Sequence, residues 1–433
     1  MVLFLTRTGS LSYYNHKLKR SSLIQLNMNN HINTHALKLK GRILTLPCNV
    51  TIKTKEKTFE VTATKAFKIS PKKRIVCSGN WGKEKIVMKF FLESLRASHY
   101  FKKELKGLKA LKRAGIRTPD IVFCGVVENT KIKVIATKEI LPASDMMSVW
   151  NSIKENAVYA DLQKQIIHKI AVIHNAGLKQ DDLHLGNFLI SKNRIYTIDG
   201  DGVDASRKGP PLSEKLSLEN VSILFSQFYP TLDKISRISL EYYAECRGWT
   251  DKQGYIPGLF DRIKPRIQKI RSQKLKKYLK KIFRDCSEFF HKKNWGMELV
   301  CDRKAFDAGL KKFLDTPDRF INKGKILKTE KNSIITQIEI DSTSYVVKTY
   351  TIKNIAHFSE KYLKKTRARL SWHNAHLLKQ LGTFFPHPLC FMEERSGPIC
   401  LKAYFVVEFK SDHEPEKYAE LFLKLEKNRL NPE

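Results

Sequence analysis

The chain has 433 residues, of which 42% are hydrophobic and 28% are charged, so two or three domains are expected and wholesale disorder is excluded. Lys and Arg number 79 against 43 Asp and Glu, and the formal net charge of +36 favours polyanionic partners such as nucleotide phosphates, nucleic acid, anionic lipid or phosphorylated glycans. Solvated lysine-rich faces that only keep the protein soluble are the alternative. The eight cysteines form no C-x-x-C pair, which argues against a zinc ribbon and fits a reducing cytoplasm.

Residues 1–40 are rich in Asn, His and Lys and show little periodicity, so we expect an N-terminal tail. The first residues hold only a brief apolar patch, far short of a signal-peptide core. No later window approaches the roughly 18 uncharged apolar residues that a membrane span needs. These features predict a cytoplasmic protein, with any membrane contact at the surface.

Residues 41–141 are predicted to form a small lobe of antiparallel strands with one helix. Alternating segments rich in β-branched residues mark the strands: RILTLPCNVTIKT, TFEVTATKAFKI, RIVCSGNW, KIVMKFF, IVFCGVVEN and KIKVIATKEIL. The helix ends at Gly115 and Pro119. Five apolar residues share one of its faces: Tyr100, Phe101, Leu105, Leu108 and Leu111.

Residues 142–300 are predicted to form a helical lobe. A buried helix runs from Ala157 to Gly177, with apolar residues at Val158, Leu162, Ile166, Ile170 and Ile173. A polar loop (KQDDLHLGN), a short strand (RIYTID) and further helices to about residue 295 follow. A β-rich small lobe followed by a helical lobe is the bilobal layout of the protein-kinase-like fold, so the predicted class is α+β.

Residues 301–433 repeat the pattern of the small lobe. Strand-like segments, one helix and two further strands follow in the order seen in residues 66–141, and VMKFF/VVKTY, LKALKRAG/LLKQLG and IATKEI/YFVVEF fall in register. We predict an additional C-terminal β/α domain that resembles the small lobe. Lys348 aligns with Lys89, but Ser371 stands where Glu104 would be matched and no catalytic Asp follows. This copy is therefore expected to be a non-catalytic module or the remnant of a duplication.

Two residues of the first small lobe suggest nucleotide binding. Lys89 interrupts the apolar strand KIVMKFF, so its ammonium would point into a cleft and hold the α- and β-phosphates of ATP. Glu104, on the following helix, is placed to pair with it. Alternatively, Lys89 lies at a strand edge and Glu104 is an exposed helix residue among lysines. The ATP cleft would lie between the lobes, and three residues at their junction are further ATP-binding candidates: Glu139, Ile140 and Leu141.

The loop after the buried helix carries the candidate catalytic residues. Asp182 and Asn187 have the D-x-x-x-x-N spacing of a kinase catalytic loop. Asp182 would orient the acceptor hydroxyl and accept its proton, and Asn187 would hold Mg²⁺. Asp199 ends the next strand, where a kinase places its main metal carboxylate, and Asp201 is close enough to assist or to substitute. Turn chemistry alone would explain DGDG, but the complete ordered set favours phosphoryl transfer from Mg-ATP.

The runs HNAGLKQDDLHLGNFLI and YTIDGDGV resemble the bacterial lipopolysaccharide core kinases, the heptose and Kdo kinases, which are relatives of the protein kinases. The matching positions are His174, Ala176, Gly177, Asp182, Leu183, Gly186, Asn187, Phe188, Leu189, Ile198 and Asp199. The resemblance covers roughly residues 60–240. It implies ATP-dependent phosphorylation of a sugar hydroxyl of the lipopolysaccharide inner core, an anionic glycolipid, at the cytoplasmic face of the inner membrane. No DNA partner is expected, and the oligomeric state is left open.

The sequence also departs from the protein-kinase pattern. Gln180-Asp181 replaces the His-Arg of the catalytic loop, no A-P-E follows Asp199, and no G-x-G-x-x-G covers the phosphates. Three basic residues in the corresponding turn would supply charge instead, although a plain basic hairpin fits equally well: Lys72, Lys73 and Arg74. These departures weaken the interpretation as a protein kinase. They do not weaken the interpretation as a kinase that phosphorylates a small acceptor.

Two alternatives to the glycolipid kinase remain at this point. One is a protein kinase or an RNA-associated atypical kinase, and the other is a pseudokinase-type binding scaffold.

Residues 262–284 hold eleven basic and no acidic residues. This segment predicts either a basic amphipathic helix on anionic lipid or glycolipid, or a helix that buries its apolar face in the lobe.

Overall fold

The computed structural model describes residues 3–5, 11–13, 46–70, 73–92, 95–153, 155–204, 211–249, 258–351, 365–383, 385–409, 418, 420–422 and 425. The chain divides into two compact units. The first comprises residues 1–145 and 187–207, and the second comprises residues 146–186 and 208–433. The predicted mixture of helices and strands is confirmed, while the two-lobe interpretation stays a prediction.

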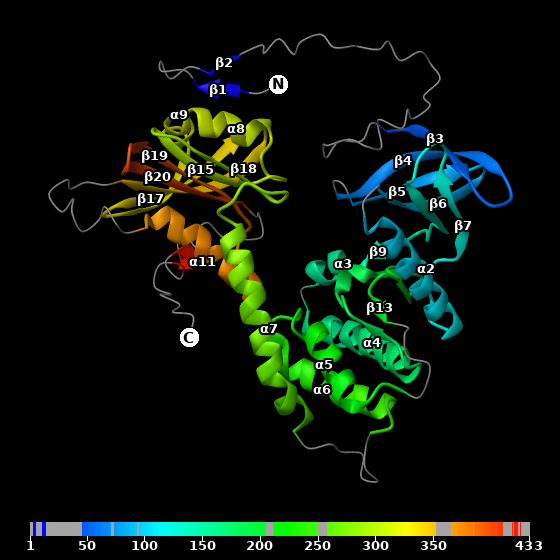
Figure 1. The fold of residues 1–433 in the computed structure, drawn as a ribbon. Helices are drawn as coiled ribbons and strands as arrows, with labels where there is room; N and C mark the ends of the chain where they lie inside the picture. Colours follow the sequence, from blue (N-terminus) through cyan, green and yellow to red (C-terminus); the bar gives the residue numbers. More distant parts are fainter. Residues whose placement is uncertain are drawn as a thin grey trace. The chain divides into compact units, whose positions relative to one another are not determined.

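Six antiparallel strands of the first unit close into a barrel in the order β3-β4-β5-β6-β8-β7 (Figure 1). The strands are β3 Cys48–Lys53, β4 Thr58–Ser70, β5 Arg74–Trp81, β6 Glu84–Phe91, β7 Ile121–Val127 and β8 Lys133–Lys138. Alternate side chains fill the interior, among them Val50, Ile52, Val61, Ile86, Met88 and Val134. Pairing of β3 with both β4 and β7 closes the barrel and leaves β6 flanked on both sides.

The helix α2, Ala97–Arg113, joins β6 to β7 and packs on the barrel through Ala97 and Leu108. Its buried face differs from the predicted one because it includes Glu104, whereas Tyr100 is 39% exposed. Glu104 can lie inside this face because its carboxylate pairs with Lys89. The pattern of apolar residues alone therefore misplaced the buried face by part of a turn.

Short strands complete the first unit. β9 (Ser144–Asp145), β11 (Phe188–Ser191) and β12 (Arg194–Thr197) form a three-stranded antiparallel sheet, and β13 is Val203–Asp204. The chain from β12 to β13 carries Asp199 and Asp201. Within the predicted tail, two strands not expected from the sequence pair antiparallel: β1 Leu3–Leu5 and β2 Leu11–Tyr13.

Helices make up the first part of the second unit. They are α3 Met146–Ser152, α4 Asn156–Asn175, α5 Glu214–Phe225, α6 Asp233–Cys246 and α7 Leu259–Lys281, with the short elements β10 Lys179–Gln180, η1 Leu185–Asn187 and η2 Pro230–Leu232. The predicted helix over residues 157–177 is confirmed as α4. Four of its five predicted core residues are buried, but Val158 in the first turn is exposed.

The basic segment over residues 262–284 lies in α7 as far as Lys281, where the helix ends. Ile263 and Ile267 are buried, and Tyr278 packs against the core around α11. Arginines on other faces of α7 pair with carboxylates of α5 and α6, as in Arg262–Glu214 and Arg271–Asp233. The apolar face is therefore inside the protein, and contact of α7 with an anionic surface would use its lysines.

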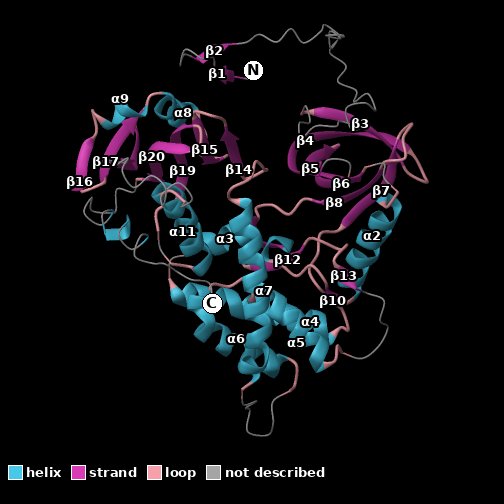
Figure 2. Cartoon of the chain, turned by 60° about the vertical axis from the view of Figure 1, so that its left-hand side comes forward, coloured by secondary structure: helices cyan, strands magenta, loops and turns pink. Residues whose placement is uncertain are grey.

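A seven-stranded sheet in the order β14-β15-β19-β20-β18-β17-β16 forms the C-terminal part of the second unit (Figure 2). Its strands are β14 Phe289–Lys293, β15 Met297–Asp302, β16 Lys325–Glu330, β17 Ser333–Ile340, β18 Thr343–Thr351, β19 Pro388–Ser396 and β20 Ile399–Glu408. The prediction of helices to about residue 295 was wrong, because β14 and β15 extend this sheet beside β19.

Helices flank both faces of the seven-stranded sheet. α11 (Arg367–Leu381) packs on the side that carries Val346 and Phe405, and α8 (Ala308–Asp315) packs on the side of Val347. The short helix α9 is Pro317–Ile321. The strand order β16-β17-β18-β20-β19, with a helix after the third strand, is the order of β4-β5-β6-β8-β7 with α2. The internal repeat read from the sequence thus recurs in the topology.

Candidate active site

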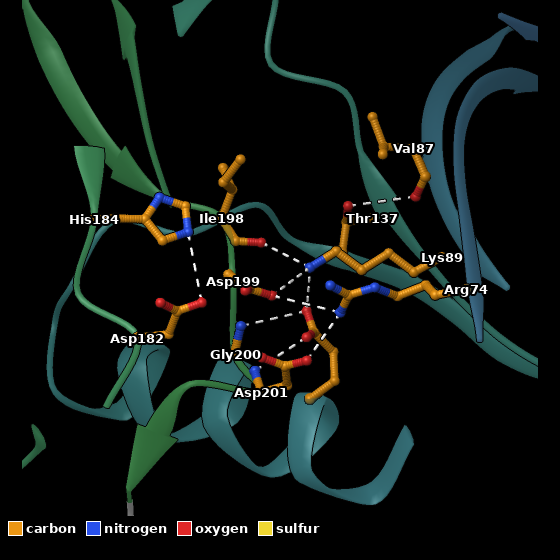
Figure 3. A network of polar contacts seen from close by, with 11 residues as sticks. Arg74, Val87, Lys89, Thr137, Asp182, His184, Ile198, Asp199, Gly200 and Asp201 are labelled. Atoms are coloured by element: carbon orange, nitrogen blue, oxygen red, sulfur yellow. Dashed lines mark hydrogen bonds and ion pairs between the residues drawn. The ribbon is translucent and has the colours of Figure 1, made fainter. Parts of the chain in front are cut away.

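The ammonium of Lys89 lies in the first unit beside two carboxylates (Figure 3). It donates hydrogen bonds to Glu104 Oε1 (2.5 Å), to the carbonyl oxygen of Ile198 (3.0 Å) and to Asp199 Oδ1 (3.1 Å). These contacts use all three N–H donors of the ammonium. Burial alone would lower the pKa of Lys89, but Glu104 and Asp199 raise it above its usual value, so the cation is stabilised. The alternative of an edge lysine is wrong, since β5 and β8 flank β6.

The carboxylate of Glu104 is fully buried and ties α2 to the segment after β12. Oε1 accepts from Lys89 and from the backbone N–H of Gly200 (3.3 Å), and Oε2 accepts from the N–H of Asp201 (3.0 Å). Burial raises the pKa of Glu104, and Lys89 partly offsets that effect. The expected pairing of Lys89 with Glu104 is present, and the alternative of an exposed helix glutamate is wrong.

Two glycines allow this close approach. A Cβ on Gly107 of α2 would stand 1.9 Å from the carbonyl oxygen of Gly200, and a Cβ on Gly200 would stand 2.4 Å from the carbonyl oxygen of Glu104. Any side chain at either position would push α2 away from the segment that carries Asp199. The sequence offered a signal for this contact, because glycine is unfavourable inside a helix unless something approaches it.

Asp199 and Asp201 face a second cation, Arg74, the first residue of β5 (Figure 3). Arg74 Nη1 donates to Asp201 Oδ2 at 2.9 Å and lies 3.9 Å from Asp199 Oδ1. Burial would raise the pKa of Asp199, but Lys89 and Arg74 outweigh it and hold that pKa at about 2. Burial and the neighbouring Asp199 raise the pKa of Asp201. Arg74 was predicted only as part of a basic turn; its contact with the acidic pair was missed. Lys72 of that turn lies outside the described residues.

These carboxylates form the one candidate metal cluster found among the described residues. One oxygen from each of Glu104, Asp199 and Asp201 lies within 4.8 Å of the others. Oxygen ligands of this kind suit Mg²⁺. Glu104 is already engaged by Lys89 and two backbone N–H groups, so Asp199 and Asp201 are the residues that fit a metal ion.

The first unit also holds four other residues that the sequence predicted for the site. The carbonyl oxygen of Asn187 accepts from the N–H of Ile198 (3.0 Å), which places this buried asparagine, the last residue of η1, beside the residue that precedes Asp199. Glu139 follows β8, and its N–H donates to the carbonyl oxygen of Lys85 (2.9 Å). Ile140 is half-buried and Leu141 is exposed.

Asp182 belongs to the second unit and its side chain is 74% exposed. His184 Nε2 lies 3.6 Å from Asp182 Oδ2 (Figure 3). Gln227, which precedes η2, fixes the loop by donating to the carbonyl oxygen of Leu183 and accepting from the N–H of Leu185. Lys274 of α7 is near enough for Asp182 to influence it, although burial dominates and lowers its pKa. Gln227 and Lys274 carry no motif and were not predicted.

A buried polar network holds the start of the same loop. His174 Nδ1 lies 2.6 Å from the Tyr243 hydroxyl, and Nε2 lies 3.0 Å from Asn220 Oδ1. Asn220 in turn donates to the carbonyl oxygen of Gln180 (2.8 Å), two residues before Asp182. Burial lowers the pKa of His174 to about 4, so the imidazole is neutral. The histidine of the sequence motif is thus an orienting residue of the loop.

The central part of the chain is similar to a family of lipopolysaccharide core biosynthesis proteins. Residues 63–221 match the family model described as "Lipopolysaccharide core biosynthesis protein (WaaY)", which confirms the resemblance inferred from the catalytic run. No curated protein matches the chain.

Two crystal structures of the Mycobacterium tuberculosis PknI kinase domain are among the similar solved structures. One, of a domain with a single cysteine replaced by alanine, is 10% identical over 47% of this chain and 94% of that chain, with a TM-score of 0.31. The other is 10% identical over 47% of this chain and 95% of that chain, with a TM-score of 0.30.

None of the helices built from the described residues combines the length and apolar character required to cross a bilayer.

Proposed function

We propose that this protein is an ATP-dependent phosphotransferase that phosphorylates a sugar hydroxyl of the lipopolysaccharide inner core. The family match over residues 63–221 supports the acceptor class. The observation that carries the chemistry is the Lys89–Glu104 ion pair at 2.5 Å with Asp199 beside it. An aimed ammonium next to carboxylates that can hold a metal ion is what phosphoryl transfer requires of a protein.

Each residue has a role in this proposal. Lys89, held by Glu104, binds the α- and β-phosphates. Asp199 is the main metal carboxylate because its low pKa keeps it ionised, and Asp201 and Asn187 assist. Mg²⁺ held there supplies charge neutralisation at the phosphate oxygens when bound.

The role of acting on the acceptor is assigned to the loop that carries Asp182. Asp182 orients the sugar hydroxyl and accepts its proton, in the loop held by Gln227 and by the His174–Asn220 network. The backbone at Glu139, Ile140 and Leu141 contacts the base of ATP. The protein would bind the anionic glycolipid at the cytoplasmic face of the inner membrane and contact only the membrane surface. The C-terminal sheet is a non-catalytic relative of the small lobe.

The test is mass spectrometry of purified lipid A–core glycolipid after incubation with the full-length protein and Mg-ATP. The wild type is expected to add the mass of one phosphate, whereas Asp182→Ala is expected to bind ATP and add none. Since Asp182 is exposed, its removal should leave the fold intact.

Other outcomes would separate the alternatives. ATP binding by the wild type without a mass gain on the glycolipid would overturn this acceptor and favour a protein or RNA acceptor. A wild-type chain that binds no ATP would favour a scaffold. Retained transfer in Asp182→Ala would remove Asp182 from the reaction.

A further inference from the structure

Arg74 makes a contact that the proposed reaction does not explain. Its guanidinium donates to Asp201 at 2.9 Å and lies 3.9 Å from Asp199, the two carboxylates assigned to the metal. The side chain is 21% exposed, so solvent and ligands reach it. A cation that pairs with a metal-binding carboxylate occupies the position that a metal ion would need.

The charge balance shows why a cation belongs there in the absence of metal. Glu104, Asp199 and Asp201 bring three carboxylates within 4.8 Å. Lys89 pairs with the first two, at 2.5 and 3.1 Å, and leaves Asp201 to Arg74. Without Arg74, three neighbouring carboxylates would share a partly buried site with one ammonium, which is unfavourable in a low dielectric.

The same contact becomes unfavourable once a divalent ion binds. Mg²⁺ lies about 2 Å from its carboxylate oxygens, so a guanidinium on Asp201 would be held within a few ångströms of a doubly charged cation. Arg74 is suited to leave. Within the described part of the chain it uses one of its five N–H donors in a side-chain hydrogen bond, whereas Lys89 uses all three of its own.

The position of Arg74 also indicates where it would go. It begins β5 directly after the β4–β5 turn, whose Lys73 N–H closes onto the carbonyl oxygen of Ser70 (3.0 Å). In the proposed kinase arrangement this hairpin lies where a glycine-rich loop would cover the phosphates. A planar guanidinium binds phosphate through two parallel N–H groups.

We propose that Arg74 is an exchangeable counterion of the metal site: it pairs with Asp201 while the metal is absent, and it moves to the triphosphate when the metal–nucleotide complex binds. This inference rests on the proposed function. It explains how a site without glycine-rich backbone N–H groups holds phosphates, and how three carboxylates stay together before the metal arrives.

The test measures two affinities of the full-length protein without turnover. Mn²⁺ alone is titrated by electron paramagnetic resonance, and the Mg²⁺ complex of adenylyl imidodiphosphate is titrated by calorimetry. In Arg74→Ala, Mn²⁺ is expected to bind about fivefold tighter because its competitor is gone, and the nucleotide complex at least about tenfold weaker because a phosphate ligand is lost. Lys68→Ala, which removes one exposed charge from the adjoining strand β4, should change both values less than about twofold.

Arg74→Lys keeps the positive charge but loses the two parallel N–H groups of the guanidinium. It serves as the second variant if Arg74→Ala fails to fold. It should leave the Mn²⁺ affinity near the wild-type value and weaken the nucleotide complex. A nucleotide affinity unchanged in both variants would overturn the exchange, because Arg74 would then serve only as a counterion. A Mn²⁺ affinity unchanged or lowered in Arg74→Ala would also overturn it. A wild-type protein that binds neither probe would contradict the proposed function instead.

Discussion

Lys89 and Lys348 hold corresponding places in two sheets of the same strand order but have different partners. Lys89 pairs with a glutamate of the neighbouring helix and with Asp199. Lys348 is fully buried and pairs with Glu330 of β16 (3.3 Å), with its ammonium 5.5 Å from the ring centre of Tyr350. Ser371, at the place of Glu104, shares a 2.8 Å hydrogen bond with the Tyr350 hydroxyl. A lysine in this position is therefore not by itself a sign of nucleotide binding.

This difference gives a matched pair of substitutions. Lys89→Met should remove ATP binding and lower transfer by at least about a hundredfold, because the phosphates lose their cation. Lys348→Met should lower the melting temperature because the ion pair between the buried Lys348 and Glu330 is lost, and should leave kcat and the KM for ATP within about twofold. The measurements are nucleotide titration, steady-state kinetics and thermal melting. Loss of ATP affinity in Lys348→Met would show that the second sheet takes part in nucleotide binding.

At the scale of elements, the contact between α2 and the Asp199 segment depends on two glycines. Gly107→Ala adds a methyl group 1.9 Å from the carbonyl oxygen of Gly200. Alanine favours a helix over glycine by about 1 kcal/mol, so an exposed site would be stabilised. Here the clash should win, with a net destabilisation of roughly 1–3 kcal/mol and a larger loss of activity as Glu104 moves away from Lys89. Chemical denaturation and kinetics check this.

The control for Gly107→Ala lies one residue earlier in the same helix. Lys106 is exposed, so Lys106→Ala should change the free energy of unfolding by less than about 0.5 kcal/mol and leave activity intact. If Gly107→Ala were as active as Lys106→Ala, the close approach of α2 would not be needed for the site.

Two buried histidines join helices of the second unit and predict how its stability depends on pH. His174 links α4 to α5 and α6, and His376 of α11 pairs with the Tyr278 hydroxyl of α7 (2.7 Å). Burial lowers their pKa values from 6.5 to about 4 and about 3. Below about pH 6.5 these histidines bind protons in the unfolded chain but stay neutral in the folded chain until the pH approaches their lowered pKa values. The free energy of unfolding therefore falls as the pH falls from about 6.5 toward about 4.

At pH 5 each histidine should cost roughly 2 kcal/mol of stability relative to pH 7.5. Denaturation at both pH values is the measurement. His174→Gln and His376→Gln should be less stable at pH 7.5 and should each lose about half of the pH dependence. An equally steep dependence in both variants would assign it to other groups.

The sequence predicted most elements and the residue types of the site, for identifiable reasons. Strands such as β6 and β18 and helices such as α4 have strong periodicity, and the D-x-x-x-x-N loop has fixed spacing. The strands β14 and β15 were missed because they are short, FFHKK and MELVCD, and lack a clear alternation; β15 is held by pairing with β19, and β14 by pairing with β15. Glu104 could be paired with Lys89 but not shown to be buried, and Arg74 could not be placed on Asp201, because both contacts join segments far apart in the chain.

At the scale of the whole molecule, the formal net charge is +36, and Lys89 and Arg74 are cations that carboxylates of the candidate site engage. Exposed lysines of α7 such as Lys276, Lys277 and Lys280 would attract the proposed anionic acceptor over distances at which salt screens charge, with a Debye length of about 10 Å at 0.1 M. Lys89 and Arg74 act at close contact and are screened less.

Added salt should therefore mainly weaken the binding of the anionic glycolipid acceptor. Between 50 and 500 mM NaCl, the KM for the anionic glycolipid is expected to rise roughly tenfold, while kcat and the KM for ATP change much less. Replacing Lys276, Lys277 and Lys280 by Gln should raise that KM at low salt and flatten its dependence on salt. Initial-rate kinetics of the full-length protein measure both. If the KM for the glycolipid did not respond to salt, the positive surface would serve solubility alone, and acceptor recognition would have to reside in contacts close to Asp182.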